Sequence, residues 1–176
     1  MLKQAENSVK IEGILSEIDL KTGSTVKNGK TIEYIGGSIK VRVTQMINGQ
    51  EVDLEIPVFM YSNKLTNAGG PNPAYESINR VMTEYTSIAA AGIDAADRVR
   101  ITNGNIRMNE YYNQNGSLNS YPRINASFVT KVTDMSKFTP EASFSAVFVI
   151  AAMGYDTDKD GVQIENRFKI RGILPQ

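Results

Sequence analysis

Two runs of alternating apolar and polar residues, joined by an Asn-Gly pair, constrain the fold of this chain more than any other feature. The runs are Ser38–Ile47 and Glu51–Tyr61, and Asn48-Gly49 stands between them. Alternation with a period of two is typical of a strand with one buried face, and Asn-Gly favours a two-residue turn between antiparallel strands. So short a turn fixes the register of the hairpin. The predicted cross-strand pairs are Ile47 with Gln50, Val43 with Leu54, Arg42 with Glu55, and Val41 with Ile56.

Three further segments have the residue pattern of strands. They are Val9–Asp19, Arg98–Glu110 and Arg123–Val132. Gly13 interrupts the first of them, and Asn103-Gly104 interrupts the second, as a bulge or a sharp bend would. The sequence therefore predicts five strands, two of them with an irregularity in the middle.

One helix is expected after the third strand. Asn72 is a good N-cap residue, Pro73 suits the first helical position, and Gly92 suits the end. Apolar residues recur between them at the spacing of a helix. These are Ile78, Val81, Met82, Tyr85 and Ile88.

Two long connections complete the order of elements. Residues 20–38 and 111–122 are rich in Gly, Asn, Ser and Thr, and we expect them to be loops, apart from a short ribbon through 31–35. The predicted order is therefore strand, strand, strand, helix, strand, strand. The long loops join the first strand to the second and the fourth strand to the fifth.

This order resembles the OB-fold single-stranded DNA-binding proteins of bacteria and bacteriophages, over roughly residues 8–133. The segments that carry the resemblance are IEGILSEID, VRITNGNIRMNEYYNQNGS and YPRINASFV. The resemblance implies a five-stranded OB-fold barrel with one helix, in which residues 1–133 bind nucleic acid. It also implies a protein that coats single-stranded DNA in replication, recombination or repair. Such proteins commonly cooperate along the strand, so we expect a homo-oligomer or a cooperative array, with replication or recombination proteins as further partners.

Residues 134–176 lie outside the resemblance. Residues 144–153 and 162–174 have the pattern of two strands, and YDTDKDG joins them. They are expected to form a C-terminal β-hairpin, and three roles stay open: a hairpin against the barrel, an arm that reaches a neighbour, or the start of a further domain. Asp156, Asp158, Asp160 and Gly161 match the opening of a calcium-binding loop, but Arg167 stands where the bidentate Glu is needed. We therefore expect a polar turn there, without a metal.

The composition excludes several kinds of chemistry. The chain has no Cys and no His, which excludes disulfides, thiolate or imidazole metal sites and every relay that needs a histidine. Gly69-Gly70 lacks the Lys-Ser/Thr of a phosphate-binding loop. We expect a protein that is not an enzyme and that holds no cofactor or metal.

Charge and hydropathy bear on the partners. The 19 basic and 19 acidic side chains cancel, although nucleic-acid binders usually carry a basic excess. A local basic stripe can still bind phosphates when the rest of the surface cancels it. The longest apolar run, Ala146–Met153, is too short to span a bilayer, and the N-terminus lacks the apolar core of a signal peptide. We expect no membrane contact and a location in the cytoplasm, that of the host cell if a phage encodes the protein.

The predicted DNA-binding residues combine rings that stack on bases with cations that contact phosphates. They are Tyr34, Lys40, Arg42, Phe59, Tyr61, Arg107, Tyr111, Tyr112, Tyr121 and Arg123. Two alternatives stay open. In the first, Phe59 and Tyr61 pack beneath the helix or a loop and are not available to bases. In the second, Arg42 forms a cross-strand ion pair with Glu55 and contacts no phosphate.

A second function is compatible with the same residues. The neutral net charge and the unassigned C-terminal strands favour a non-catalytic structural or protein-interaction barrel of a phage. That alternative predicts that charge reversal at Lys40 and Arg107 leaves function intact, whereas DNA binding predicts a loss.

Overall fold

The computed structural model describes residues 6–173 of the chain. It divides into two compact units. One runs from Ser8 to Phe144, and the other combines, among the described residues, Glu6 and Asn7 with residues 145–173. The unit that contains the predicted nucleic-acid domain thus extends beyond residue 133, where the sequence placed the boundary.

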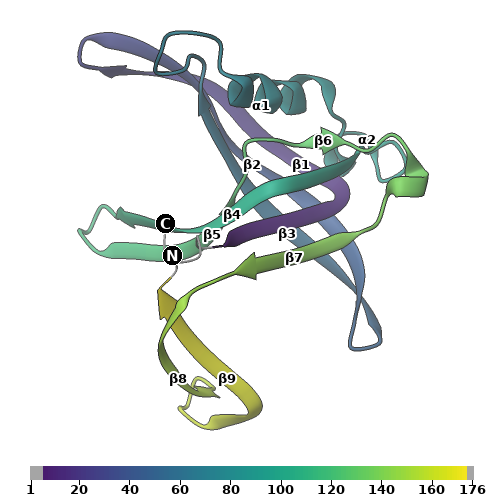
Figure 1. Cartoon of the computed structure of the whole chain (residues 1–176), viewed down its shortest axis with the longest axis vertical. Coiled ribbons are helices and arrows are strands. Elements are labelled where there is room, and N and C mark those ends of the chain that lie inside the picture. Colours follow the sequence, from purple (N-terminus) through teal and green to yellow (C-terminus); the bar gives the residue numbers. More distant parts are fainter. Residues whose placement is uncertain (1–5, 174–176) are drawn as a thin grey trace, which may run out of the picture. The chain divides into compact units, whose positions relative to one another are not determined.

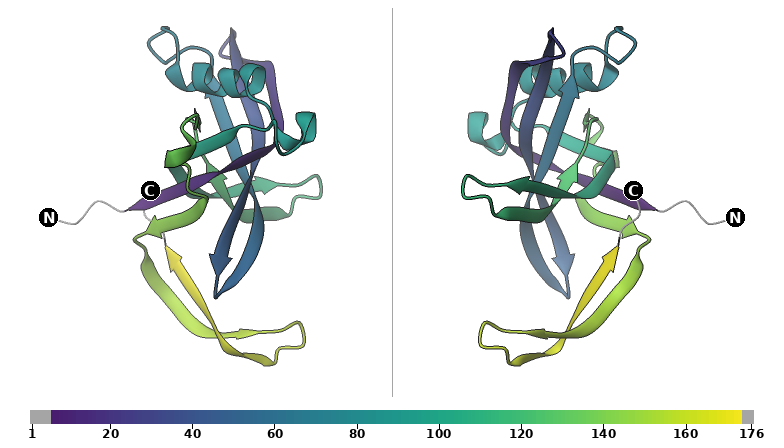
Figure 2. Two further views of the ribbon diagram at one scale, coloured as in Figure 1. Left: turned by 90° about the vertical axis from the view of Figure 1, so that its right-hand side faces the viewer. Right: turned by 90° about the vertical axis from the view of Figure 1, so that its left-hand side faces the viewer.

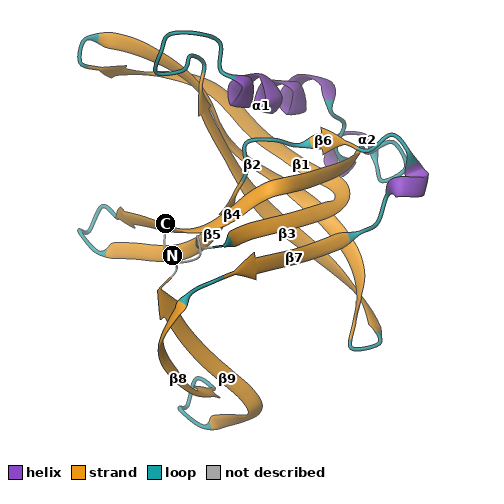
Figure 3. Ribbon diagram, viewed as in Figure 1, coloured by secondary structure: helices purple, strands orange, loops and turns teal. Residues whose placement is uncertain are grey.

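The first unit is mostly β-structure around a closed sheet (Figures 1 and 3). Its strands are β1 (Asn7–Lys27), β2 (Lys30–Ile47), β3 (Gln50–Asn63), β4 (Arg98–Tyr112), β5 (Leu118–Asn125), β6 (Thr130–Lys131) and β7 (Glu141–Ala146). Its helices are α1 (Pro73–Glu84), α2 (Ile88–Ala91) and the 3-10 turn η1 (Met135–Lys137). Within the described residues the strands follow the order β6-β4-β5-β3-β2-β1-β7, and β1 also pairs with β4. That extra pairing closes the sheet into a barrel that resembles an OB-fold, with more strands than the predicted five.

Closure depends on a change of partner within β1. This strand pairs with β4 from Val9 to Ile14 and with β2 from Ile14 to Lys27. Gly13 lies at the change, where a Cβ atom would stand 2.3 Å from the carbonyl oxygen of Arg42. Only glycine lets the two backbones approach so closely. The register irregularities of β1 lie on either side of Gly13, between Val9 and Ile11 and between Leu15 and Glu17, and Gly13 itself is the point of close approach at the change of partner.

Alternate side chains of the strands fill the interior of the barrel. The fully buried core residues come from four strands and from α1, and they are Ile11, Leu15, Ile35, Ile39, Val41, Val43, Val58, Met60, Ile78, Val81, Val99 and Ile101. The β2–β3 pairs predicted from Asn48-Gly49 are all present, so the predicted register is confirmed. Both turn residues have positive φ, 51° and 80°, as this kind of turn requires.

Most of the two expected long loops is strand instead, although the ribbon expected through 31–35 is present within β2 and residues 113–117 do form a turn. β1 and β2 continue to a second Asn-Gly turn at Asn28-Gly29, with φ of 50° and 72°. β4 and β5 pair as far as Tyr112 and Leu118. The prediction of loops was wrong because polar composition was taken as a sign of missing structure, whereas these strands are polar because both faces meet water. Figure 2 shows that the β1–β2, β2–β3 and β4–β5 hairpins run out of the barrel in different directions.

The predicted helix begins as expected and ends early. The Asn72 side chain accepts a hydrogen bond from the backbone N–H of Ala74 at 3.1 Å. The helix stops at Glu84 because Thr86 pairs with Asp97 instead. Its N–H donates to the Asp97 carboxylate, and its carbonyl accepts from the Asp97 N–H, both at 2.9 Å. The separate turn α2 then ends at Gly92. The predicted fifth strand is likewise divided, because β5 ends at Asn125 and β6 begins at Thr130.

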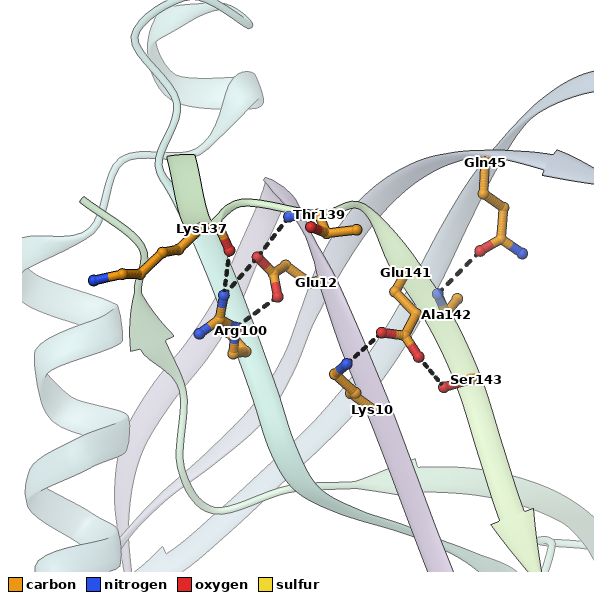
Figure 4. A network of polar contacts seen from close by, with 9 residues as sticks. All are labelled: Lys10, Glu12, Gln45, Arg100, Lys137, Thr139, Glu141, Ala142 and Ser143. Carbon is orange, nitrogen blue, oxygen red and sulfur yellow. Dashed lines mark hydrogen bonds and ion pairs between the residues drawn. The ribbon is translucent and has the colours of Figure 1, made fainter. Parts of the chain in front are cut away.

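A network of polar contacts holds the segment around η1 on the barrel (Figure 4). The buried Glu12 carboxylate accepts two hydrogen bonds from Arg100, at 2.6 and 2.8 Å, and one from the Thr139 N–H at 2.9 Å. Arg100 also donates to the carbonyl of Lys137 at 2.6 Å. These contacts join β1 and β4 to a segment that the sequence had assigned to the C-terminal extension.

The second unit contains a hairpin of β8 (Val149–Thr157) and β9 (Gln163–Ile173). In its turn, the Asp158 carboxylate accepts from the N–H groups of Asp160 and Val162, both at 2.9 Å. Asp156 forms ion pairs with Arg167 and Lys169. In the described part of the chain, no group of three His, Cys, Asp or Glu residues could hold a metal ion. None of the described helices is long and apolar enough to span a bilayer.

Candidate nucleic-acid interface

A groove crosses the outer face of β3, β5 and β4. Two adjoining hollows of about 410 and 480 Å³ form it, and both are lined by Phe59 and Arg123. The first hollow is also lined by Tyr61, Asn103, Asn105, Arg107, Asn125, Ala126 and Ser127. The second is also lined by Ser38, Pro57, Tyr121, Pro122 and Ile124. We call the two hollows together the β3–β5 groove.

Strand alternation puts the aromatic residues of β3 on this face. Phe59 and Tyr61 alternate with Val58, Met60 and Ser62, which are buried in the barrel. Phe59 does not offer an open ring, because the guanidinium carbon of Arg123 lies 3.7 Å from its ring centroid. The planar guanidinium therefore forms part of the groove wall in place of the ring, and bases stack on such planes as they do on aromatic rings.

Arg123 also has unused hydrogen-bonding capacity. Its Nε atom is buried and has no hydrogen-bond partner within the described residues. A guanidinium carries five N–H donors, and a buried donor without a partner costs roughly 1–3 kcal/mol. The unpaired Nε donor is thus unfavourable, whereas the contact of the guanidinium with the Phe59 ring is favourable.

The tyrosines near the groove are fixed in position and still exposed. The Tyr34 and Tyr61 rings lie 5.4 Å apart, and the Tyr111 and Tyr121 rings meet edge to face at 6.3 Å. Tyr61 keeps 47% of its surface exposed, so the helix does not cover it. Tyr112 at the end of β4 is 73% exposed. Each pair presents rings whose orientation is set before any ligand arrives.

Tyr34 is held from both sides. A Cβ atom at Gly23 would stand 2.7 Å from the Tyr34 ring, so the ring lies directly over this glycine of β1. Its other neighbour is Tyr61 of β3. Tyr34 thus connects the β1–β2 ribbon, which continues to Lys27 and Lys30 at its tip, to Tyr61 in the groove.

The cations on this face fall into two classes. Lys40 forms an ion pair with Glu17 at 2.5 Å, which raises the pKa of the lysine, and Arg42 pairs with Glu55 at 2.9 Å. The Arg107 Nε donates to the Asn105 amide oxygen at 3.1 Å, and within residues 6–173 neither Arg107 nor Arg123 has a carboxylate partner. Among the described residues, no Asp or Glu lines the β3–β5 groove. The groove is therefore locally positive in a chain without net charge.

The structure thus brings seven of the ten predicted residues to one region. Phe59, Tyr61, Tyr121, Arg107 and Arg123 line the groove, and Tyr34 and Tyr111 pack against two of them. Lys40 and Arg42 lie on the same face but are paired with carboxylates, and Tyr112 lies at the end of the β4–β5 hairpin. The role of each residue in binding stays a prediction.

Sequence reasoning missed the amide side chains of the groove. They are Asn103 and Asn105 on β4, and Asn125, the last residue of β5. The signal for two of them was present, because 103, 105 and 107 alternate on one strand and Arg107 was already a predicted phosphate contact. Asn side chains both donate and accept, so they can contact base edges or sugar and phosphate oxygens.

Comparison with known proteins places the chain in a family. No curated protein matches it. Among solved structures it is similar to a deletion mutant of the single-stranded DNA binding protein from Thermus aquaticus, with 10% identity and a TM-score of 0.45, over 96% of this chain and 74% of that chain. The model of the YorF family matches residues 5–176. Because this match covers nearly the whole chain, the protein belongs to the YorF family.

Proposed function

We propose that this protein binds single-stranded DNA in the β3–β5 groove, without catalysis and with little sequence preference. The observation that carries the proposal is the composition of the groove. Exposed rings and two arginines without carboxylate partners line it, and no acidic residue does, although the whole chain is neutral. A barrel that resembles an OB-fold supports the proposal, because such barrels bind oligonucleotides on this part of their surface.

The groove would contact the two parts of a nucleotide by different means. Bases stack on Tyr61 and on the tyrosines of the β4–β5 hairpin, and each stacked base contributes roughly 1–3 kcal/mol. Arg107 and Arg123 contact the phosphates. Every base has a flat face and every nucleotide has a phosphate, so these contacts tolerate any sequence. A duplex keeps its bases stacked on each other, and the single strand is therefore preferred.

The role that fits such binding is to coat and protect single-stranded DNA during replication, recombination or repair, in the cytoplasm. The sequence resemblance described above supports this role. Stacking and ion pairing leave the DNA chemically unchanged, so the proposed protein needs no cofactor and is not an enzyme.

Intrinsic fluorescence tests the proposal directly. The chain has eight Tyr and no Trp, so tyrosine emission is readable without interference. We expect an oligo-dT to quench it at low salt, and a duplex of equal length to quench it far less. Binding should weaken as salt rises, because phosphate contacts release counterions. A folded protein whose emission does not change with oligo-dT at low salt would refute the proposal.

Charge reversal separates this function from a protein-interaction barrel. Arg107→Glu should reduce the affinity for oligo-dT, because it places a negative charge in a groove that has none. An Arg107→Glu variant that binds oligo-dT as well as the wild type would favour the protein-interaction role instead.

A further inference from the structure

The β8–β9 hairpin has one face that is entirely apolar. Six large side chains share it, and their exposed fractions run from 41% for Phe148 to 66% for Met153. The six are Phe148, Ile150, Met153, Tyr155, Phe168 and Ile170. We call this set the hairpin face.

The strand register assigns these residues to the same side. Met153 pairs with Ile170 and Tyr155 pairs with Phe168, and paired residues point to the same face of a ribbon. The register shifts by one residue between Ile150 and Ala152. Ile150, which pairs with Gly172, therefore lies on the same side as Met153 and Tyr155. Phe148 lies over Gly172, where a Cβ atom would stand 2.2 Å from its ring.

The other side of the same ribbon is basic. Arg167, Lys169 and Arg171 alternate with Phe168 and Ile170 and therefore point away from the hairpin face. Within this side, Arg167 and Lys169 pair with Asp156. The hairpin is thus an amphipathic ribbon: the hairpin face is apolar, whereas the other side carries these cations together with the exposed Val149 and Ile173 at its end.

A two-stranded ribbon of this kind needs a covering layer. An isolated hairpin is at best marginally stable in water, and large exposed apolar patches mark contact sites. In the described residues the β8–β9 sheet has no third strand. The Tyr155 and Phe168 rings, 5.1 Å apart, cluster at one end of the face, and Ile150 and Phe148 lie toward the other end, next to Gly172.

We propose that the hairpin face is the interface between two copies of this chain, related by a two-fold axis. At roughly 200 Å² for a large side chain, the six residues expose on the order of 650 Å² per copy. Two copies would bury about 1,300 Å², which lies within the range of specific interfaces. A two-fold axis that lies in the interface and perpendicular to the strands would set the Tyr155 end of one ribbon on the Phe148 end of the other, so that apolar side chains meet along the whole face.

Charge supports a second copy as the occupant. In a face-to-face pair of ribbons, both basic sides point outward to water, so their like charges lie on opposite surfaces of the pair. Two sheets pack about 10 Å apart, and no cation needs to be buried between them. The neutral net charge of the chain also leaves no long-range repulsion between copies. This inference does not depend on DNA binding.

Sedimentation velocity without DNA tests the interface on the full chain. We expect a wild-type dimer at micromolar concentration. Phe168→Glu should raise the dimer dissociation constant on the order of 100-fold or more, because it buries an unpaired charge at two symmetry-related positions. The matched control is Ile173→Glu, on the same strand but the basic side, which is 64% exposed and should leave the dimer intact. Equal effects of both variants, or a monomeric wild type, would overturn the proposal.

Milder substitutions distinguish loss of the interface from unfolding of the hairpin caused by Phe168→Glu. Because the chain has no Cys, Ile170→Cys and Ile173→Cys each provide one reactive thiol. A short bismaleimide should link Ile170→Cys chains into dimers much faster than Ile173→Cys chains. Equal linking rates would overturn the proposal. So would a wild-type protein that stays monomeric and binds anionic lipid vesicles by the hairpin face, as measured by cosedimentation.

Discussion

Tyr61 combines a fixed orientation with an exposed ring. Its hydroxyl donates to the Asn63 amide oxygen at 3.1 Å, and its ring lies against Tyr34. A side chain that is already ordered loses little entropy when a base stacks on it. This property makes Tyr61 the residue whose ring is expected to matter most for binding.

Replacing the ring should lower the affinity for oligo-dT. We expect Tyr61→Ala to cost roughly 1–3 kcal/mol of binding free energy, the value of one stacked base. Tyr61→Phe keeps the ring and loses only the hydrogen bond to Asn63, so it should bind nearly as well as the wild type. Fluorescence anisotropy with a labelled oligo-dT measures both. A similar loss in both variants would show that the hydroxyl, and not the ring, contributes the affinity.

Arg107 is expected to act through its charge. Each phosphate contact on a single strand contributes about 0.7 to the slope of log affinity against log salt. Arg107→Gln should reduce the magnitude of that slope by about this amount, as measured by titrations at several salt concentrations. In the control, Glu33→Gln with Lys64→Gln removes an ion pair outside the predicted binding residues without changing net charge and should leave the slope unchanged. An unchanged slope in Arg107→Gln would exclude its phosphate contact.

At the scale of elements, Glu12 connects three parts of the barrel. It lies on β1, its main partner Arg100 lies on β4, and Thr139 follows η1. The hydrogen bonds from Arg100 hold the pKa of Glu12 below its ordinary value of 4.5, and the Thr139 N–H lowers the pKa further, whereas burial acts in the opposite direction. The charged form of Glu12 therefore stabilises the fold.

This pairing should make stability depend on pH. Because the folded-state pKa of Glu12 is lowered, its contribution is present above about pH 4.5 and is lost as the pH falls through the folded-state value. Glu12→Gln should cost about 2 kcal/mol at pH 7 and flatten the loss of stability in acid. Urea unfolding between pH 3 and pH 7 measures this. Glu141→Gln, which breaks an exposed pair with Lys10, should have a much smaller effect.

Gly13 is a second element-scale determinant, because closure of the barrel needs its missing side chain. Gly13→Ala would place a carbon against the Arg42 carbonyl and should cost at least about 2–3 kcal/mol, since backbone must move. Gly49→Ala is the comparison, because its Cβ meets nothing within 4 Å and only the positive φ is unfavourable. We expect about 1–2 kcal/mol there. Thermal unfolding followed by circular dichroism ranks the two, and an equal cost would contradict the proposed role of Gly13 in closure.

At the scale of the whole molecule, the two units bury apolar surface differently. The barrel encloses a core with side chains from four strands and α1, whereas the large apolar side chains of β8 and β9 are exposed. The Glu12 network lies wholly in the barrel unit, which ends at Phe144. The barrel therefore has the contacts that it needs to fold without the hairpin.

A chain truncated after Phe144 should remain folded. We expect a cooperative thermal transition close to that of the full chain, and the same affinity for a short oligo-dT, because every residue of the groove is retained. Self-association should be lost. Circular dichroism, fluorescence titration and sedimentation measure the three properties. An unfolded truncated chain would show that the barrel depends on the C-terminal strands.

The sequence alone determined the features that depend on neighbouring residues. Asn48-Gly49 fixed the β2–β3 register, and with it the Arg42–Glu55 pair. Asn72 and Pro73 fixed the start of α1. A second Asn-Gly pair, at Asn28-Gly29, carried the same information about β1 and β2 and was overlooked because the flanking strands are polar. Turn and capping signals are readable because the groups that interact are only a few residues apart.

The tertiary structure alone decided the features whose partners are distant in sequence. Glu17 on β1 neutralises Lys40, and Asp97 binds Thr86 just beyond the end of α1 at Glu84. Arg123 covers Phe59, which leaves the stacking surface to the tyrosines and to the guanidinium itself. The electrostatics of the groove therefore depend on which charges meet when the barrel closes. Local sequence patterns do not encode that pairing, because it results from the packing of the whole sheet.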